Sequence, residues 1–354
     1  MAGQSEDTGD AITCRQAEGA RLRSGWRMTL GSRYPRSLRR RLLLLLLGNL
    51  LLAGLMSARL SQEGAGGISA LMSGFAPNAA PRILAGIGLT GIILCGAIDL
   101  SIGSIIVMAG TVFGIGYEWG QPPWLCFTAC FITAWGLSAF NGLVVRWLGL
   151  PAIIVTLAGL TFYRGLALLL ADQAIEHFSG QIGVRIEAYH TPGKHWAGVL
   201  LSAGVLAGLV WELCGRRPRQ WLAVGNSPEA CRLSGLRPER ILHSAFLSGG
   251  LFLGLAAIVD VTNRLTIEPA RLARGFELEV IGGTVLGGTN IFGGEGSVAG
   301  TVLGVLFLYL VGQSLVLAGV SEYWRTALQG AVILGVIGID CSTHRRRKLL
   351  DELR

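Results

Sequence analysis

Ten apolar segments, separated by short polar or glycine-rich stretches, constrain the fold of this chain more than any other feature. They lie at residues 42–58, 81–98, 101–117, 124–145, 151–171, 197–214, 243–261, 277–292, 297–318 and 324–340. Each is close to the length that a helix needs to cross an apolar layer of about 30 Å. Lipid offers the backbone no hydrogen-bond partners, so each segment must pair its own amide groups as a helix. We therefore expect an all-α, polytopic membrane protein with about ten transmembrane helices.

The composition agrees with lipid as the main surroundings of the chain. Hydrophobic residues make up 51% of it and charged residues 15%, while 52 glycines would let membrane helices approach closely. Positive charge is concentrated in three clusters, Arg15 to Arg41, Arg216 to Arg240 and Arg345 to Lys348. Strict alternation of the ten segments places these clusters and both termini on the cytoplasmic side, as the positive-inside rule requires. We expect no nucleic-acid partner, because the basic clusters flank apolar segments instead of covering a soluble domain.

Three regions follow from this pattern. Residues 1–41 are basic and lack apolar periodicity, which predicts a disordered cytoplasmic arm, either lipid-binding or dispensable. Residues 42–341 form the transmembrane domain, and 342–354 a basic cytoplasmic tail. The arm is far longer than the charged start of a signal peptide, so the first apolar segment is interpreted as an anchor that stays in the protein. The expected location is a bacterial inner (plasma) membrane.

A short capped helix is predicted between two of the apolar segments. Ser227 suits the N-cap, Pro228 the first helical position, Glu229 the positive end of the helix dipole, and Gly235 the position after the helix. A helix of about two turns is not stable alone in water. It is either an ordinary surface helix or one that docks to a cytoplasmic partner, and its place in a basic loop favours docking.

Two glycine-interrupted stretches, residues 96–103 and 282–296, predict broken helices of the kind that line cavities in transporters. The first contains Asp99, an isolated carboxylate beside apolar spans, where an ionisable group marks a partner or a function. Asp99 is interpreted either as a cap of the following helix or as part of a gate, and the two roles are compatible. Arg164, within a span, is favoured as a structural arginine bonded to a carbonyl or carboxylate over a solute ligand.

Several chemistries are not supported by the sequence. The seven cysteines have no spacing typical of a metal site or a disulfide framework. Ser138 and His243 are expected at different membrane depths, which argues against an intramembrane protease. The phosphate-binding Gly-x-x-x-x-Gly-Lys-[Ser/Thr] motif is absent from the sequence, so ATP would have to be hydrolysed by another subunit. We expect no catalytic residues, no metal and no cofactor bound by this chain.

Four motifs in order resemble those of the ribose-type (monosaccharide) ABC importer permeases. Residues 96–104 read GAIDLSIGS, which is similar to the family signature GGIDLSVGS. Residues 151–157, PAIIVTL, with the later Arg164-Gly165, resemble its Pro-x-Ile-x-x-Thr-Leu and Arg-Gly stretch, and residues 285–297 resemble its late glycine-rich motif. The Glu-Ala-Cys of residues 229–231, followed by Gly235, resembles the Glu-Ala-Ala…Gly loop that engages the ATPase.

The resemblance covers about residues 42–341 and departs from the family at two positions. Ala97 replaces a usual glycine, a tolerated change, and Glu295 stands where a basic or small residue is common. The second change bears on a contact near the cytoplasmic face and thereby on transport competence.

The resemblance implies a type II ABC importer fold and a set of partners. The chain would import a monosaccharide or sugar-like solute of the ribose, rhamnose or autoinducer-2 type. It would work with a cytoplasmic ATP-binding subunit, a periplasmic or external solute-binding protein, a second permease copy or sister permease, and membrane lipids. The alternative is an ATP-independent secondary transporter.

The same resemblance, with the patterns above, nominates two groups of site residues. Those expected to couple to the ATPase are Ser227, Glu229, Ala230, Arg232 and Gly235. Those expected in the translocation path or its gate are Asp99, Ser101, Gly103, Arg164 and Thr289.

Overall fold

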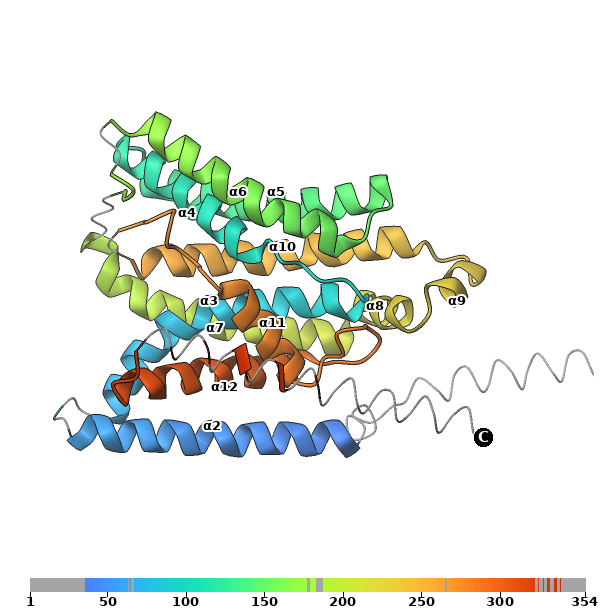
Figure 1. The fold of residues 1–354 in the computed structure, drawn as a ribbon, viewed down its shortest axis with the longest axis horizontal. Coiled ribbons are helices and arrows are strands. Elements are labelled where there is room, and N and C mark those ends of the chain that lie inside the picture. Colours follow the sequence, from blue (N-terminus) through green and yellow to red (C-terminus); the bar gives the residue numbers. More distant parts are fainter. Residues whose placement is uncertain are drawn as a thin grey trace, which may run out of the picture. The chain divides into compact units, whose positions relative to one another are not determined.

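The computed structural model describes residues 36–338, apart from 63, 65–66, 177–178, 183–186, 265 and several positions between 322 and 337. Helices make up its regular structure: α2 Arg36–Gln62, α3 Ile68–Leu94, α4 Ile102–Glu118, α5 Pro123–Leu148, α6 Ala152–Ala174, α7 Glu187–Cys214, α8 Arg217–Asn226, α9 Pro228–Leu233, α10 Pro238–Thr262, α11 Phe276–Leu286 and α12 Val298–Leu317 (Figure 1). A single isolated antiparallel bridge joins Ile182 to Ile267 in this part of the chain. The expected all-α class is confirmed. The tail 342–354 and most of the arm 1–41 lie outside the described residues.

Residues from Leu44 onward form one compact unit, and the description below concerns that unit. Helix α3 lies at its centre and packs against α7, α10, α11 and α12. Within the apolar stretch of α3, 89% of the residues are buried, against 22% in α6. The peripheral helices α5 and α6 instead expose large apolar side chains such as Trp147, Ile154 and Phe162. An apolar outer surface around a closely packed centre is what a lipid environment requires.

Among the residues that the structure describes, six helices are long and apolar enough to cross a membrane. A seventh span results if the bent pair α7 and α8 is counted as one. Helix α4 is apolar but has only 17 residues. The chain is therefore polytopic, as expected. The last expected span, 324–340, includes many residues outside the described ones.

The expected span at 277–292 is interrupted, as the glycine-rich stretch 282–296 predicted. Helix α11 ends at Leu286 after 11 residues, which cover about 16 Å, roughly half of the apolar layer. A connection with positive φ at Gly288 (95°) and Gly293 (90°) then leads to α12. A right-handed helix cannot continue through such residues, so the apolar pattern extended further than the helix.

The chain also breaks between α7 and α8, where the axes of Gly198–Cys214 and Arg217–Asn226 differ by 69°. Helices α8 and α9 follow this break and lie together at one end of the long helix α10, on the right of Figure 1. Pro218 and Trp221 of α8 are buried, whereas most of α9 is exposed. The polar segment between α7 and α10 is thus an ordered bend that contains two short helices.

Candidate functional site

A buried polar network begins in the connection between α3 and α4. Asp99 and Ser101 are both fully buried there. Asp99 Oδ1 accepts hydrogen bonds from Ser101 N at 2.8 Å and from Ser101 Oγ at 2.6 Å. Ser101 Oγ in turn accepts from Asn141 Nδ2 at 2.8 Å, and the Tyr163 hydroxyl donates to Asn141 Oδ1 at 2.6 Å. One network therefore joins the connection to α5 and α6.

The interpretation of Asp99 as a simple cap of the next helix is not supported by this geometry. Helix α4 begins at Ile102 with Ser101 as its N-cap residue, and the Ser101 side chain makes no capping hydrogen bond. Asp99 bonds the amide of Ser101, before the helix, and so closes a turn within the connection. Among the described residues, Asp99 Oδ2 has no hydrogen-bond partner. A buried carboxylate oxygen without a partner is costly, so its presence at this position calls for an explanation.

Two other predicted path residues, Gly103 and Arg164, lie next to the start of α11. A Cβ atom at Gly103 would overlap Glu277 Oε2 and would stand 3.1 Å from the Ala273 carbonyl oxygen. Arg164 Nη1 donates to the Leu272 carbonyl at 3.1 Å, which matches its interpretation as a structural arginine. Glu277 Oε2 is a second buried carboxylate oxygen without a hydrogen-bond partner in the described part of the chain.

Thr289 lies in a different place, within the glycine-rich connection between α11 and α12. It is fully buried, and a Cβ at Gly296 would stand 2.7 Å from its methyl carbon. The five predicted path residues are therefore divided among three surroundings. Asp99 and Ser101 share the buried network, Gly103 and Arg164 border the start of α11, and Thr289 lies in the connection that follows α11.

The predicted coupling helix is present as α9. Ser227 Oγ accepts from the Ala230 amide at 3.1 Å, Pro228 is the first helical residue, and Glu229 is in the first turn. After the helix, Gly235 has φ 77°. The predicted roles of Ser227, Pro228, Glu229 and Gly235 in the local geometry are confirmed.

The surface of α9 combines charge with one exposed apolar side chain. Arg232 Nη2 lies 2.6 Å from Glu239 Oε1, and this hydrogen bond raises the pKa of Arg232. Leu233 is 91% exposed, whereas Cys231 of the same helix is buried. One side of α9 therefore packs on the protein, and the other presents a leucine flanked by charges.

Sequence reasoning missed Asn141, Glu277 and Leu233. Asn141 could have been found as an isolated amide in the apolar segment 124–145. Glu277 and Leu233 carry no such signal. Glu277 matters because it contacts Gly103, and Leu233 matters because it is exposed; only the fold determines either property.

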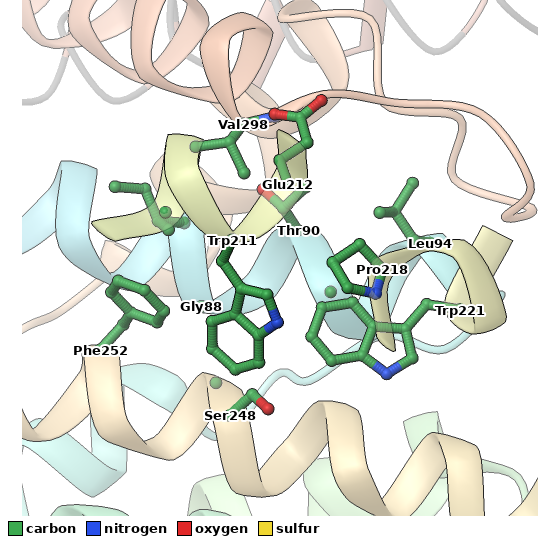
Figure 2. Close-up of a pocket in the computed structure, with 14 residues that line it drawn as sticks. Gly88, Thr90, Leu94, Trp211, Glu212, Pro218, Trp221, Ser248, Phe252 and Val298 are labelled. Carbon is green, nitrogen blue, oxygen red and sulfur yellow. The ribbon is translucent and has the colours of Figure 1, made fainter. Parts of the chain in front are cut away.

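A small cavity between α3, α7, α8 and α10 has a volume of about 30 Å³. Figure 2 shows Trp211, Trp221 and Phe252 around it, with Thr90 and Ser248 among the lining residues. The ring centroids of Trp211 and Trp221 are 5.6 Å apart. A space of this size holds about one or two water molecules, whereas small-molecule sites typically need about 300 Å³ or more. The cavity does not hold a sugar-sized solute in this conformation.

Comparison with known proteins places the chain in a family. Residues 71–337 match the family described as the permease component of branched-chain amino acid transport systems. The chain belongs to this permease family. No solved structure matches it. Family membership confirms the resemblance drawn from the motifs and makes the chain a multi-pass membrane permease.

Relatives of the permease carry the name autoinducer 2 import system permease protein LsrC. The protein from Photorhabdus laumondii is 34% identical over 264 residues, which are 73% of this chain and 77% of the relative. The protein from Yersinia enterocolitica is 31% identical over 74% of this chain and 74% of the relative. The protein from Escherichia coli HS is 32% identical over 73% of this chain and 75% of the relative. The matches therefore cover most of the length of both partners.

Proposed function

We propose that this permease is the membrane-spanning subunit of a bacterial ABC importer for a sugar-like solute of the ribose, rhamnose or autoinducer-2 type. Its family supports the role of permease, and the names of its relatives support import of a small polar solute. ATP would be hydrolysed by a separate subunit, since the sequence lacks the phosphate-binding motif. The chain itself would carry out transport and no covalent chemistry.

The observation that carries the proposal is the geometry of α9. This helix has six residues, fewer than a helix needs to be stable alone, yet it is capped and partly buried. It presents Leu233 with an exposed fraction of 91% between charged neighbours. A single apolar side chain surrounded by charges suits a groove on a soluble partner, where burial of a leucine stabilises a complex by about 1.5–3 kcal/mol.

The five predicted coupling residues have distinct parts in this docking. Ser227 and Gly235 would fix the two ends of α9, while the exposed Ala230 would allow the partner to approach the helix backbone. Glu229 and Arg232 would supply polar contacts around Leu233, and Arg232 is already held by Glu239. The cytoplasmic ATP-binding subunit is the partner that this surface suits.

The predicted path residues would act in gating. ATP-driven movement of α9 would shift the connection that contains Asp99 and Ser101, and the network to α5 and α6 would transmit the shift. Gly103 would allow α4 to pass closely over Glu277, and Arg164 would hold the segment before α11. Thr289 would take part in the connection that follows α11.

The complete importer would contain a second permease copy or sister permease, an external solute-binding protein and surrounding lipid. We place it in the bacterial inner membrane with both termini in the cytoplasm, because the three basic clusters then share one side. The division into an arm (1–41), a transmembrane domain (42–341) and a tail (342–354) belongs to the same proposal. The exposed apolar side chains of α5 and α6 would face lipid.

The test is reconstitution of the permease with its Walker-type ATPase and its solute-binding protein. Replacing Leu233 by Ser should weaken association with the ATPase about tenfold or more and reduce solute-stimulated ATP hydrolysis to match. Leu150→Ser is the control, because Leu150 is also an exposed leucine but lies in the loop between α5 and α6, outside α9. Equal association of the wild type and both variants would contradict docking through α9.

A further inference from the structure

The backbone of the chain comes unusually close to itself where α8 ends. Three segments meet there, and we call their meeting point the glycine junction. It consists of Leu94 at the end of α3 and Gly96 just after it, Gly225 and Asn226 at the end of α8, and Gly293 and Gly294 in the connection before α12.

The peptide groups of Gly294 are bonded from two sides at this junction. The Gly294 amide donates to the Leu94 carbonyl at 3.0 Å. The Gly294 carbonyl accepts from Asn226 Nδ2 at 3.1 Å. Asn226 Nδ2 also donates to the Leu222 carbonyl at 2.8 Å, so its amide joins the last turn of α8 to Gly294. A single side chain therefore links α8 to the end of α3 through one glycine.

The same three segments pack backbone against backbone. A Cβ at Gly225 would overlap the Leu94 carbonyl oxygen and the Gly294 amide nitrogen. A Cβ at Gly293 would stand 2.6 Å from the Gly96 nitrogen and 3.0 Å from the Gly225 Cα. Main-chain atoms cannot swing aside as the end of a side chain can, so these contacts resist relative movement.

The junction lies between the two predicted sites. Asn226 directly precedes Ser227, the N-cap residue of α9. On the other side, Gly96 is followed after two residues by Asp99. Helix α8 is held to its neighbours as well, since Trp221 packs on Gly91 of α3 and its Nε1 donates to Ser244 Oγ of α10 at 3.1 Å. A displacement of α9 can therefore reach Asp99 through a few residues that are packed backbone against backbone.

From these contacts we infer that Gly225 and Asn226 are positioning residues that transmit displacement of α9 through Gly294 to the connection containing Asp99. This inference rests on the proposed function, because it assumes that the ATPase moves α9. A movement that displaces Asn226 pulls on the Gly294 carbonyl, and the amide of the same residue is bonded to the end of α3. Loss of the Asn226 amide should therefore separate ATP hydrolysis from transport, without removing the surface that binds the ATPase.

The first measurement tests the junction in the purified full-length permease, independently of any ATPase. Cys95 is buried beside Gly96, and Cys130 of α5 is buried away from the junction. Maleimide labelling is followed by mass spectrometry of the peptides that contain each thiol. Asn226→Ala should raise the labelling rate of Cys95 about fivefold or more and leave Cys130 unchanged.

A matched control exists in α3. Asn78 Nδ2 donates to the Gly74 carbonyl four residues earlier, as Asn226 does to Leu222, and both asparagines are exposed, but Asn78 does not bond to the junction. Asn78→Ala should leave the Cys95 rate as in the wild type. An unchanged Cys95 rate in Asn226→Ala would overturn the inference.

Unfolding is distinguished by Cys130. If Asn226→Ala exposes Cys130 as well, Asn226→Gln is used, because its longer side chain cannot place one amide on both Leu222 and Gly294. A selective rise at Cys95 in the glutamine variant supports the inference. A rise at both thiols in both variants overturns it, since the junction would then be part of the general core.

The second measurement tests transmission in proteoliposomes with the ATPase and the solute-binding protein. Asn226→Ala and Gly225→Ala should retain ATPase association and stimulated hydrolysis within about twofold, while solute uptake per ATP falls about fivefold or more. Gly136→Ala is the control, since Gly136 lies in a helix with no atom within 4 Å of an added Cβ. Loss of ATPase association, or unchanged uptake per ATP, would overturn the inference. Failure of the wild-type complex to form would instead contradict the proposed function and leave the cysteine result standing.

Discussion

At the scale of single residues, two buried carboxylates of the permease lack part of their hydrogen bonding. Asp99 and Glu277 each have one buried oxygen without a hydrogen-bond partner among the described residues. Asp99 is held by Ser101 and connected through it to Asn141 and Tyr163. Such groups are kept at a cost to stability.

Replacing Asp99 by Asn tests the charge at this position. Asn keeps an oxygen that can accept from Ser101 but loses a charge-assisted hydrogen bond, which is about twice as strong as a neutral one. We expect solute uptake to fall about tenfold at equal membrane abundance. Uptake is measured in membrane vesicles, with Asp172→Asn, an exposed carboxylate at the end of α6, as the control. Wild-type uptake by Asp99→Asn would make the residue purely structural.

Replacing Gly103 by Ala tests the close approach of α4 to α11. The new methyl group would overlap Glu277 Oε2 and crowd the Ala273 carbonyl oxygen. Overpacking of this kind costs about 1–3 kcal/mol, so the unfolding temperature of the purified permease should fall. Combining Gly103→Ala with Glu277→Ala should recover part of the loss. No recovery would mean that the main chain at Ala273 causes the whole effect.

At the scale of elements, local sequence predicted short-range geometry well. The ends of α9 depend on Ser227, Pro228 and Gly235, whose effects are confined to one or two turns. The glycines of 282–296 predicted a break in this span but not the residue at which α11 ends. Apolar residues continue through Ile291 and Phe292 after the helix has stopped. The glycines there are governed by contacts with α3 and α8, which are distant in sequence.

Replacing Gly235 by Val tests whether the end of α9 matters for docking. Gly235 has φ 77°, a conformation that costs a residue with a side chain about 1–2 kcal/mol, and more for a β-branched one. We expect weaker co-purification with the ATPase and normal membrane insertion. Gly235→Asn is the matched control, because Asn adopts this conformation readily. Equal loss in both variants would point to the added volume rather than to backbone conformation.

At the scale of the whole molecule, apolar composition predicted which segments meet lipid but not which helix is central. The stretch Pro77–Leu94 of α3 is the least apolar of the six candidate spans and yet the most buried. In a membrane, a helix surrounded by other helices can carry small and polar residues, whereas a peripheral helix needs apolar side chains on the face that meets lipid. Hydropathy therefore predicted the class of protein, but it did not predict which helix is buried at the centre.

The arrangement of the spans is tested by topology. Reporter fusions after Gly215 and after Arg347 should both give cytoplasmic signals, because both positions adjoin basic clusters. A fusion within residues 180–195 should give an external signal. The fusions are scored with a reporter active only in the cytoplasm and one active only outside it. A cytoplasmic signal within 180–195 would contradict the ten-span arrangement.

The backbone packing around Gly225 also limits how the permease can change during evolution. The three atoms nearest to a Cβ at this position all belong to the main chain, at Leu94, Gly293 and Gly294. No substitution at those neighbours can make room, because a change of side chain does not remove the main-chain atoms that the Cβ would meet. Genetic suppressors of Gly225→Ala should therefore be insertions or deletions that alter the length of the 287–297 connection.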